Sequence, residues 1–275
     1  RNPKVLAPDD LIVVVNTGDD FDHLGLRICP DIDTVTYTLA GIANSETGWG
    51  LQGETWNFMD ALEQLGGETW FRLGDRDLAT HIERTRLLQS GETLSAITTR
   101  FADRLGIRHR ILPATDDTLR TIVKTPEGPL PFQEYFVKQQ CAPIATGFEF
   151  VGAADATPSP EISRAFERGD VEGVILCPSN PYVSIAPTTA IPAFSAFLAR
   201  ADIPVIAVSP IVGGRAIKGP AAKMMSELGE TPSVLSVAAH YRGLITALVI
   251  DTVDAAEADK IRALGIDVVL GPGLN

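Results

Sequence analysis

The stretch Leu11-Ile-Val-Val-Val15, followed by Asn16-Thr-Gly-Asp-Asp20, decides the fold class of this 275-residue chain. A continuous run of β-branched residues that ends in a polar turn is typical of a strand buried on both faces. Four later segments repeat this design, each an apolar run that enters a loop: Val174-Ile-Leu-Cys177, Pro204-Val-Ile-Ala-Val208, Ile245-Thr-Ala-Leu-Val-Ile250 and Asp267-Val-Val-Leu270.

Helical patterns separate the later runs. We expect helices over 192–200, 220–228, 234–241 and 255–264, the last stopped by Gly265. Strands that alternate with helices predict an α/β fold with a mostly parallel sheet, and we expect all five strands to share it.

Residues 51–150 have a different pattern. Amphipathic helices are expected over 55–65, 78–89 and 94–105, followed by short strands over 110–112, 119–124, 132–137 and 147–151, with a hairpin turn at Glu127-Gly128. The sequence therefore predicts a core made of residues 1–50 and 151–275, with an inserted smaller α+β domain at 51–150.

Composition excludes several classes of protein. An apolar share of 45% excludes a mainly disordered chain, and a net charge of −12 without a basic block disfavours nucleic-acid binding. Three cysteines without C-x-x-C spacing favour a reduced cytoplasm over a disulfide framework or a thiolate zinc site. No apolar run is long enough to span a bilayer. The absence of G-x-G-x-x-G after any strand disfavours a dinucleotide oxidoreductase.

Two loops that follow strands have the composition of a phosphate site. Pro178-Ser179-Asn180-Pro181 presents a hydroxyl and an amide on a stiff backbone, although Ser and Asn in such a turn also cap the next element. The loop from Ser209 contains Gly213-Gly214, Lys218 and then Gly-Pro at a helix start, where free N–H groups attract anions. An ordinary loop with a solvated Lys218 is the alternative.

Carboxylates gather at three junctions: Asp19-Asp20 after the first strand, Asp31-Ile-Asp33 before a helix expected from Thr34, and Asp75-Arg76-Asp77 before another. A single Asp there is often a helix cap, as we expect for Asp33 or Asp75 taken alone. Three such groups, with Asn16 and Arg76 nearby, are more than caps require and indicate an oxygen-rich Mg²⁺ site.

The three tryptophans, Trp49, Trp56 and Trp70, fall within one short stretch. They fit either a core cluster or a stacking surface for a planar ring.

Together these segments closely resemble the 2-phospho-L-lactate transferase family (CofD, or FbiA in actinobacteria). The resemblance runs in order from about residue 11 to the C-terminus. The most specific blocks are Leu73-Gly-Asp-Arg-Asp-Leu-Ala-Thr-His81, Pro178-Ser-Asn-Pro181 and Ser209-Pro-Ile-Val-Gly-Gly214, accompanied by Val15-Asn-Thr-Gly-Asp-Asp-Phe21, Cys29-Pro-Asp-Ile-Asp-Thr34, Glu54-Thr-Trp56, Leu112-Pro-Ala-Thr-Asp-Asp117 and Phe132-Gln-Glu134.

The resemblance implies a Rossmann-like fold with an inserted smaller domain and an enzyme of coenzyme F-420 biosynthesis. Such an enzyme transfers a phospho-lactyl or phosphoenolpyruvyl group from a guanosine-diphosphate-linked donor to the ribityl hydroxyl of the deazaflavin Fo. The hydroxyl attacks the β-phosphorus, GMP leaves and Mg²⁺ assists. We expect a cytoplasmic homodimer that acts on small molecules, without nucleic acid or membrane.

The predicted site residues lie on the junctions described above. Asp31 and Asp33 are the expected Mg²⁺ ligands, and Asp20 and Arg76 complete the expected catalytic set. The expected residues for binding the substrates are Asn16, Asp77, Ser179, Asn180, Ser209, Gly213, Gly214 and Lys218.

Three points stay open at this stage. Members of the family begin with a strand and a Gly-Gly-x-Gly-Gly loop before the region that matches Leu11; this loop is absent here, so we expect further residues to precede Arg1. The donor's three-carbon group (lactate, enolpyruvate or glycerate) is undetermined. A regulator of the same fold that binds nucleotide-sugars is the alternative function, since it needs the loops but not the acidic residues.

Overall fold

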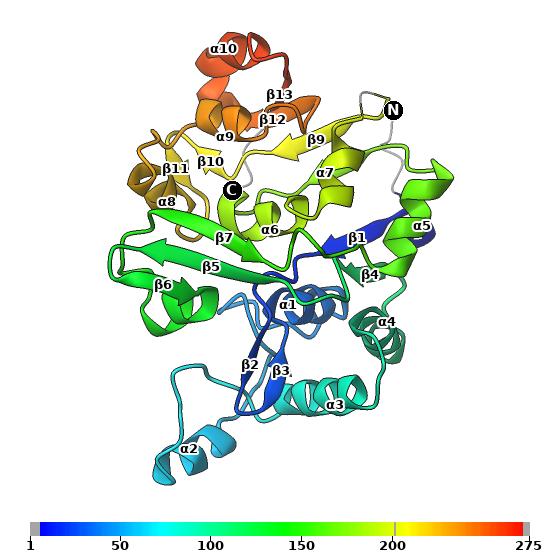
Figure 1. Ribbon diagram of the computed structural model, residues 1–275, viewed down its shortest axis with the longest axis vertical. Coiled ribbons are helices and arrows are strands. Elements are labelled where there is room, and N and C mark those ends of the chain that lie inside the picture. Colours follow the sequence, from blue (N-terminus) through cyan, green and yellow to red (C-terminus); the bar gives the residue numbers. More distant parts are fainter. Residues whose placement is uncertain (1–5, 201, 272–275) are drawn as a thin grey trace.

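Four of the five expected strands form one parallel sheet, in the order β13–β12–β9–β8 (Figure 1). The computed structural model describes residues 6–200 and 202–271, without the side chain of Asp9. The strands are β8 (Val174–Leu176), β9 (Val205–Val208), β12 (Ala247–Asp251) and β13 (Asp267–Gly271), and the intervening helices are α7 (Pro192–Leu198), α8 (Ala221–Glu227), α9 (Val234–His240) and α10 (Ala258–Arg262). The expected alternation of strand and helix is confirmed in this half of the chain.

The fifth expected strand, β1 (Ile12–Val15), lies in a separate sheet, so the prediction of one shared sheet is wrong. β1 pairs in parallel with β4 (Arg110–Pro113) over the full length of both strands. Val15 packs in a core cluster with residues of α1 (Pro30–Leu39) and α4 (Leu94–Arg104). The partner of β1 thus depends on helices that pack beside it, which the β1 sequence itself does not encode.

An antiparallel sheet with the order β6–β5–β7 consists of β5 (Arg120–Thr125), β6 (Gly128–Pro131) and β7 (Gly147–Val151). The expected hairpin turn connects β5 to β6. The strand expected over 132–137 is wrong, because residues 134–138 form a π-helix. Phe132 and Tyr135 are buried, and a three-residue spacing of buried positions suits a helix rather than a strand.

The helices near the predicted site begin close to where the sequence places them, with one exception. α2 (Asn57–Gln64), α3 (Asp77–Gln89) and α4 agree with expectation. α1 begins at Pro30 rather than Thr34, because proline is favoured at the first helical position. Asp31 and Asp33 therefore lie within its first turn. The remaining elements are β2 (Phe21–His23), β3 (Leu26–Ile28), α5 (Pro160–Arg168), α6 (Ala186–Thr189), β10 (Ile211–Val212), β11 (Arg215–Ala216), a second π-helix (Pro181–Ile185) and two 3₁₀ helices (Pro8–Asp10 and Thr252–Glu257).

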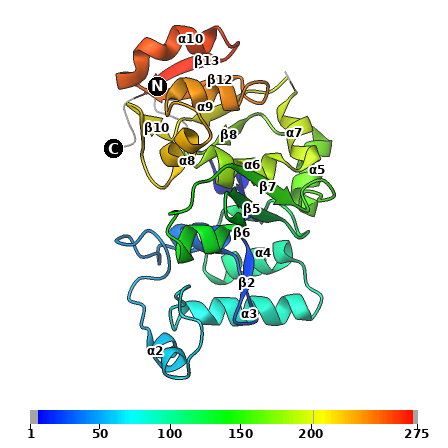
Figure 2. The same ribbon diagram turned by 60° about the vertical axis from the view of Figure 1, so that its left-hand side comes forward.

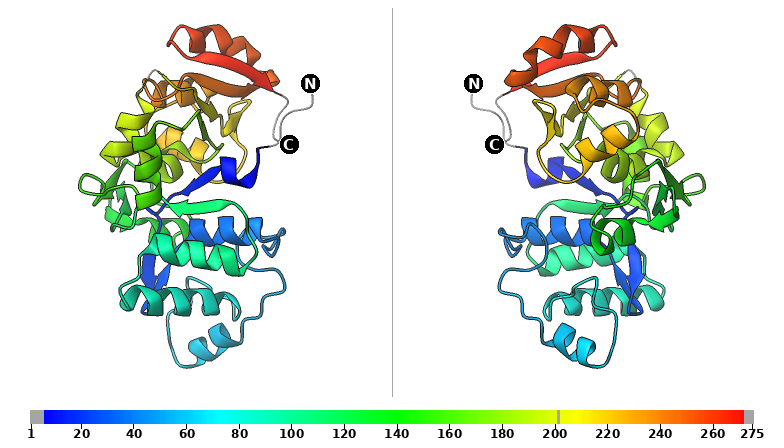
Figure 3. Two further views of the ribbon diagram at one scale, coloured as in Figure 1. Left: turned by 90° about the vertical axis from the view of Figure 1, so that its right-hand side faces the viewer. Right: turned by 90° about the vertical axis from the view of Figure 1, so that its left-hand side faces the viewer.

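The molecule is elongated in all views, with the four-stranded sheet toward one end and α2 and α3 at the other (Figures 1 and 2). Figure 3 shows β1 and β4 between the two ends. β4 comes from the segment that we expected to be an insertion, so strand pairing crosses that boundary; the division into domains stays a prediction. Within the described residues, no helix is long and apolar enough to cross a membrane.

Candidate active site

The turn after β1 meets the first turn of α1 through Asn16 and Asp31. The side-chain amide of Asn16 donates a hydrogen bond to Oδ2 of Asp31 over 3.0 Å, and its Oδ1 accepts one from the backbone N–H of Gly18 over 2.8 Å. The turn is tightly packed, since a Cβ on Gly18 would lie 2.6 Å from the Cβ of Pro187. Asn16 therefore holds both the turn and the direction of the Asp31 carboxylate.

Asp19 and Asp20 lie in the same turn, with exposed fractions of only 7% and 3%. One carboxyl oxygen of each has no hydrogen-bond partner within the part of the chain that the structure describes. Burial and repulsion from Asp31 raise the pKa of Asp19 well above its ordinary range. Burial also raises the pKa of Asp20 to about 7, although the Cys29 thiol and nearby arginines oppose the shift. We call Asp19, Asp20 and Asp31 the acidic cluster.

The acidic cluster supplies the type of ligand that Mg²⁺ prefers. Hard cations bind carboxylate oxygens, and crowded buried carboxylates repel one another until a cation joins them. The unpartnered oxygens of Asp19 and Asp20 fit such a cation. In the described residues, however, no group of three or more His, Cys, Asp or Glu is already arranged around a common metal position. Binding of Mg²⁺ here therefore stays a prediction.

Asp33, the second expected metal ligand, contacts an arginine. Its Oδ2 accepts a hydrogen bond from Nη1 of Arg84 over 3.2 Å, and its Oδ1 accepts another from Nη2. Burial alone would lower the pKa of Arg84, but the Asp33 carboxylate raises it overall. Arg84 is not among the site residues that the sequence motifs predicted. Its signal is the spacing Asp77, His81, Arg84, which places the three side chains on one face of α3.

A polar network continues from this ion pair between α3 and α1. The imidazole of His81 lies 3.7 Å from Asp33 through Nδ1 and 3.2 Å from Asp77 through Nε2. The hydroxyl of Tyr37 on α1 donates to Oδ1 of Asp77. Asp77 is thus engaged between the two helices, and its expected role in binding substrate stays a prediction.

Arg76 and its neighbours form a reciprocal pair of helix caps. Asp75, just before α3, accepts hydrogen bonds from the backbone N–H groups of Asn57 and Phe58 at the start of α2. The hydroxyl of Thr55 also donates to Asp75, and these bonds lower its pKa to about 2. Glu54, just before α2, accepts from the backbone N–H groups at residues 76 and 77. The expectation that Asp75 is a cap is confirmed, although the helix that it caps is α2.

The guanidinium of Arg76 contacts the loop before α2. Its Nη1 donates to the carbonyl oxygen of Gln52 over 2.8 Å, and the side chain is exposed. The structure therefore does not bring Arg76 to the acidic cluster through any contact among the described residues, and its catalytic role stays a prediction.

The loop after β8 shows the capping alternative for Asn180. Its Oδ1 accepts from the backbone N–H of Tyr182 over 3.0 Å at the start of the π-helix 181–185, and its Nδ2 lies 3.2 Å from the sulfur of Met224. Ser179 is half-buried in the same loop. Asn180 therefore shapes this loop, and nucleotide binding by either residue stays a prediction.

In the loop after β9, two of the expected residues have hydrogen-bond partners among the described residues, and two others are exposed. Ser209 is buried, and its hydroxyl donates a hydrogen bond to the carbonyl oxygen of Ile211 and accepts one from the backbone N–H of Ile211. Gly213 and Gly214 are exposed and have φ of 54° and 76°, the left-handed region that favours glycine. The N–H of Gly213 donates to Asp254, whereas Lys218 is exposed. Of these expected residues, Lys218 is the one best placed to meet an anion from solvent.

The tryptophans divide into two groups. Trp70 packs with Phe21, His23 and Phe71 against the β2–β3 hairpin, which matches the core interpretation. Trp49 and Trp56 meet edge to face with ring centroids 6.4 Å apart, and Trp49 is half exposed. Trp56 also packs against the core cluster that includes Leu73, and the guanidinium of Arg72 lies 4.1 Å from its ring centroid. The ring-stacking alternative therefore stays open for Trp49.

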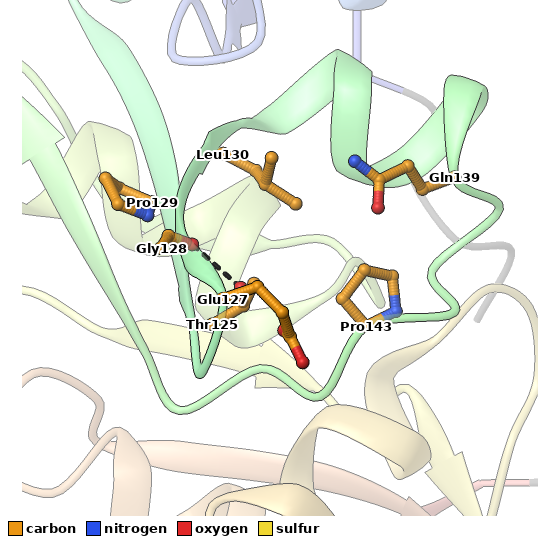
Figure 4. Close-up of a pocket in the computed structure, with 7 residues that line it drawn as sticks. All are labelled: Thr125, Glu127, Gly128, Pro129, Leu130, Gln139 and Pro143. Atoms are coloured by element: carbon orange, nitrogen blue, oxygen red, sulfur yellow. Dashed lines mark hydrogen bonds between the residues drawn. The ribbon is translucent and has the colours of Figure 1, made fainter.

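Two hollows lie apart from the acidic cluster. Figure 4 shows one of about 240 Å³ at the β5–β6 turn, lined by Thr125, Glu127, Gly128, Pro129, Leu130, Gln139 and Pro143. None of these residues belongs to the predicted site. The other, of about 560 Å³, lies among α1, α3 and α4 and has Asp33, Tyr37 and Arg84 in its lining. None of the three acids of the cluster lines either hollow: Asp19 and Asp20 are buried in the turn after β1, and Asp31 is half-buried in the first turn of α1.

Comparison with known proteins identifies the family. The sequence profile described as "2-phospho-L-lactate transferase CofD" matches residues 4–269. A Streptomyces coelicolor protein named phosphoenolpyruvate transferase is 41% identical over 273 residues, which cover 97% of this chain and 85% of the relative. A Mycobacterium tuberculosis protein of the same name is 37% identical over 276 residues, covering 96% of this chain and 83% of the relative.

A crystal structure of a UPF0052 family member from Bacillus halodurans has a TM-score of 0.58 at 12% identity, covering 95% of this chain and 84% of the other, so it supports the fold alone. The resemblance in the sequence is therefore confirmed by a profile match over nearly the whole chain. The chain belongs to the 2-phospho-L-lactate transferase CofD family and is a transferase.

Proposed function

We propose that this transferase moves a phospho-lactyl or phosphoenolpyruvyl group from a guanosine-diphosphate-linked donor to the ribityl hydroxyl of Fo, with release of GMP, in coenzyme F-420 biosynthesis. The family match and two relatives named phosphoenolpyruvate transferase support this reaction. The observation that carries it is the acidic cluster at the carboxyl end of β1, the side of an α/β sheet on which ligands bind.

The residues of the cluster divide the work of the reaction. Asp19 and Asp31 would hold Mg²⁺, which when bound neutralises charge on the diphosphate. Asn16 fixes the direction of Asp31 through its hydrogen bond. Asp20 would take the proton of the attacking hydroxyl, because a general base works best when its pKa lies near the working pH, and burial raises the pKa of Asp20 to about 7.

Bond changes in the proposed step are simple. The ribityl oxygen forms a bond to the β-phosphorus as the bond from that phosphorus to the oxygen bridging it to GMP breaks, and the hydroxyl proton goes to Asp20. Such a transfer depends on placement and charge neutralisation more than on covalent help from the protein. The exposed loop with Gly213, Gly214 and Lys218 would receive the guanosine diphosphate.

The nucleotide-sugar-binding regulator is less well supported than the transferase. A protein that only binds a nucleotide needs the loops after β8 and β9. It has no use for three crowded carboxyl groups, two of which are buried, because burial of a carboxylate is unfavourable without a partner cation. The buried state of Asp19 and Asp20 therefore favours transfer chemistry.

Asp31→Asn tests the proposal because it keeps the size of the side chain and removes its charge. We expect a sharp loss of turnover in the presence of Fo, the donor and Mg²⁺. Mass spectrometry of the phosphodiester product measures this turnover. GDP affinity and the thermal melt should stay near those of the native protein. The matched control is Asp103→Asn, on an exposed position of α4.

Near-normal turnover in Asp31→Asn with an unshifted Mg²⁺ dependence would show that Asp31 is a structural residue of the first turn of α1. No product from the native protein under any Mg²⁺ concentration, together with tight GDP binding, would instead support the regulator.

A further inference from the structure

Asp31 and Asp33 belong to the same helical turn but contact different partners. Residues two apart on an α-helix are separated by about 200° around its axis, so their side chains leave on opposite sides. Asp31 accepts from Asn16 beside the acidic cluster, and Asp33 accepts from Arg84 on α3. A single cation contacting both carboxylates would require one of these contacts to break.

Arg84 is a buried cation on α3, with an exposed fraction of 1%. Its guanidinium contacts both oxygens of Asp33, the carbonyl oxygen of Arg27 over 3.3 Å, and Nδ1 of His81 at 3.4 Å. A planar guanidinium that contacts both oxygens of a carboxylate fixes its orientation as well as its position. Arg84 therefore ties the first turn of α1 to α3 and to the middle of β3.

We propose that Arg84 is a positioning residue for the acidic cluster and that Asp33 is its anchor rather than a metal ligand. By holding Asp33 on one side of the first turn, Arg84 directs Asp31 toward Asn16 and Asp19 on the other. The inference rests on the proposed function, because it takes the acidic cluster as the place where the cation binds. It replaces the expectation that Asp33 contacts the metal.

Position and charge predict effects of opposite sign. If Arg84 acted only through its charge, removing it would lower repulsion and strengthen cation binding at the cluster. If Arg84 acts through position, removing it lets the first turn of α1 shift and weakens cation binding. A variant that removes Arg84 and Asp33 together keeps the net charge and so isolates the positional effect.

The test is a titration of the full chain with Mn²⁺ in the absence of substrates. Electron paramagnetic resonance measures the bound Mn²⁺. We expect the double variant Asp33→Asn/Arg84→Met to bind Mn²⁺ roughly 10- to 100-fold more weakly, the usual effect of losing a group that orients a ligand. Replacing both members of a buried ion pair leaves no uncompensated charge, so the fold should persist, and a thermal melt checks this.

The matched control is Glu83→Gln/Arg86→Met, which removes an exposed ion pair of the same helix. Its Mn²⁺ affinity should stay native, because exposed pairs contribute little. Arg84→Lys serves as a second variant that keeps the buried charge but cannot contact both oxygens. We expect its Mn²⁺ affinity to lie between those of the native protein and the double variant.

Native or tighter Mn²⁺ binding in both the double variant and Arg84→Lys would overturn the positioning role. Asp31→Asn in the same titration separates this failure from that of the proposed function. If Asp31→Asn loses Mn²⁺ while the double variant keeps it, only the role of Arg84 is wrong. If Asp31→Asn also keeps Mn²⁺, the acidic cluster is not the cation site and both proposals fail.

Discussion

Asp20 has a carboxyl group whose environment penalises its charged form. Burial raises its pKa from 3.8 to about 7. A carboxyl whose pKa is higher in the folded chain than in the unfolded chain binds its proton more tightly in the fold. The stability contributed by this proton is therefore fully present below the unfolded pKa and is lost as the pH rises through about 7.

We expect Asp20→Asn to remove this loss. The variant should melt at a higher temperature than the native protein at pH 8 and at nearly the same temperature at pH 4, by thermal unfolding without added metal. Asp60→Asn, on an exposed position of α2, is the control. Melting curves of Asp20→Asn and native protein that stay parallel across this range would mean that Asp20 is ionised as an ordinary surface carboxylate is.

At the scale of residues, the sequence predicted which side chains lie near each other more accurately than it predicted their orientations. Asn16 and Asp31 were expected near each other because Asn16 follows the first strand and Asp31 was placed just before the first helix. Asp33 was expected beside Asp31, but its direction depends on where α1 begins. A start at Pro30 instead of Thr34 places both residues inside the helix, and the helical rotation then separates them.

At the scale of elements, α2 and α3 exchange their N-terminal caps: the carboxylate that caps each helix belongs to a residue just before the other helix. Glu54 accepts from the backbone N–H groups at residues 76 and 77, and Asp75 accepts from those at residues 57 and 58. Gly74 makes room for this exchange, because a Cβ there would lie 2.0 Å from the Cγ of Glu54. The presence of Gly74, Glu54 and Asp75 at these positions is therefore explained by the structure of the two caps.

We expect Glu54→Ala to lower the free energy of unfolding by about 0.5–2 kcal/mol, the usual cost of losing an N-terminal cap. Gly74→Ala should produce a similar loss because the added methyl group displaces Glu54. Urea denaturation measures both, with Glu63→Ala on an exposed position of α2 as the control. A Gly74→Ala variant as stable as the native protein would show that Glu54 can cap α3 from another position.

The sequence placed α2, α3 and α4 nearly correctly because amphipathic periodicity and glycine stops are local signals. It did not reveal which acid caps which helix, because the pairing joins residues about twenty positions apart. The π-helix at residues 134–138 was missed for a related reason: its aromatic residues favour a strand locally, and only burial of Phe132 and Tyr135 shows the helical spacing.

At the scale of the whole molecule, the proposed donor site depends on loops from two neighbouring strands, β8 and β9. Lys218 is an exposed cation of the second loop. We expect Lys218→Ala to weaken GDP binding by roughly 1–3 kcal/mol, the range for a hydrogen bond to a charged group. Isothermal calorimetry measures the change, and Lys260→Ala on α10 is the control. Unchanged GDP affinity would exclude a phosphate contact by Lys218.

The sequence predicted the parallel sheet from four apolar runs, but it did not predict which strands lie outside that sheet. β1 has the same apolar pattern as those strands, yet it pairs with β4 nearly one hundred residues later. Pairing of this kind is decided by packing between distant segments, in this case α1 and α4 against β1, and no local pattern encodes it. The homodimer and the cytoplasmic location stay predictions.

The exchanged caps also govern how this end of the molecule moves. When the Asp75 carboxylate leaves the start of α2, the turn before α3 loosens. The same turn contains the backbone N–H groups of residues 76 and 77, which donate to Glu54. Neither helix can fray at its start without releasing the other, so residues 54–77 should open as one cooperative unit. In native-state hydrogen exchange, the amides of residues 57, 58, 76 and 77 should therefore share one opening free energy, and Asp75→Ala should accelerate all four together.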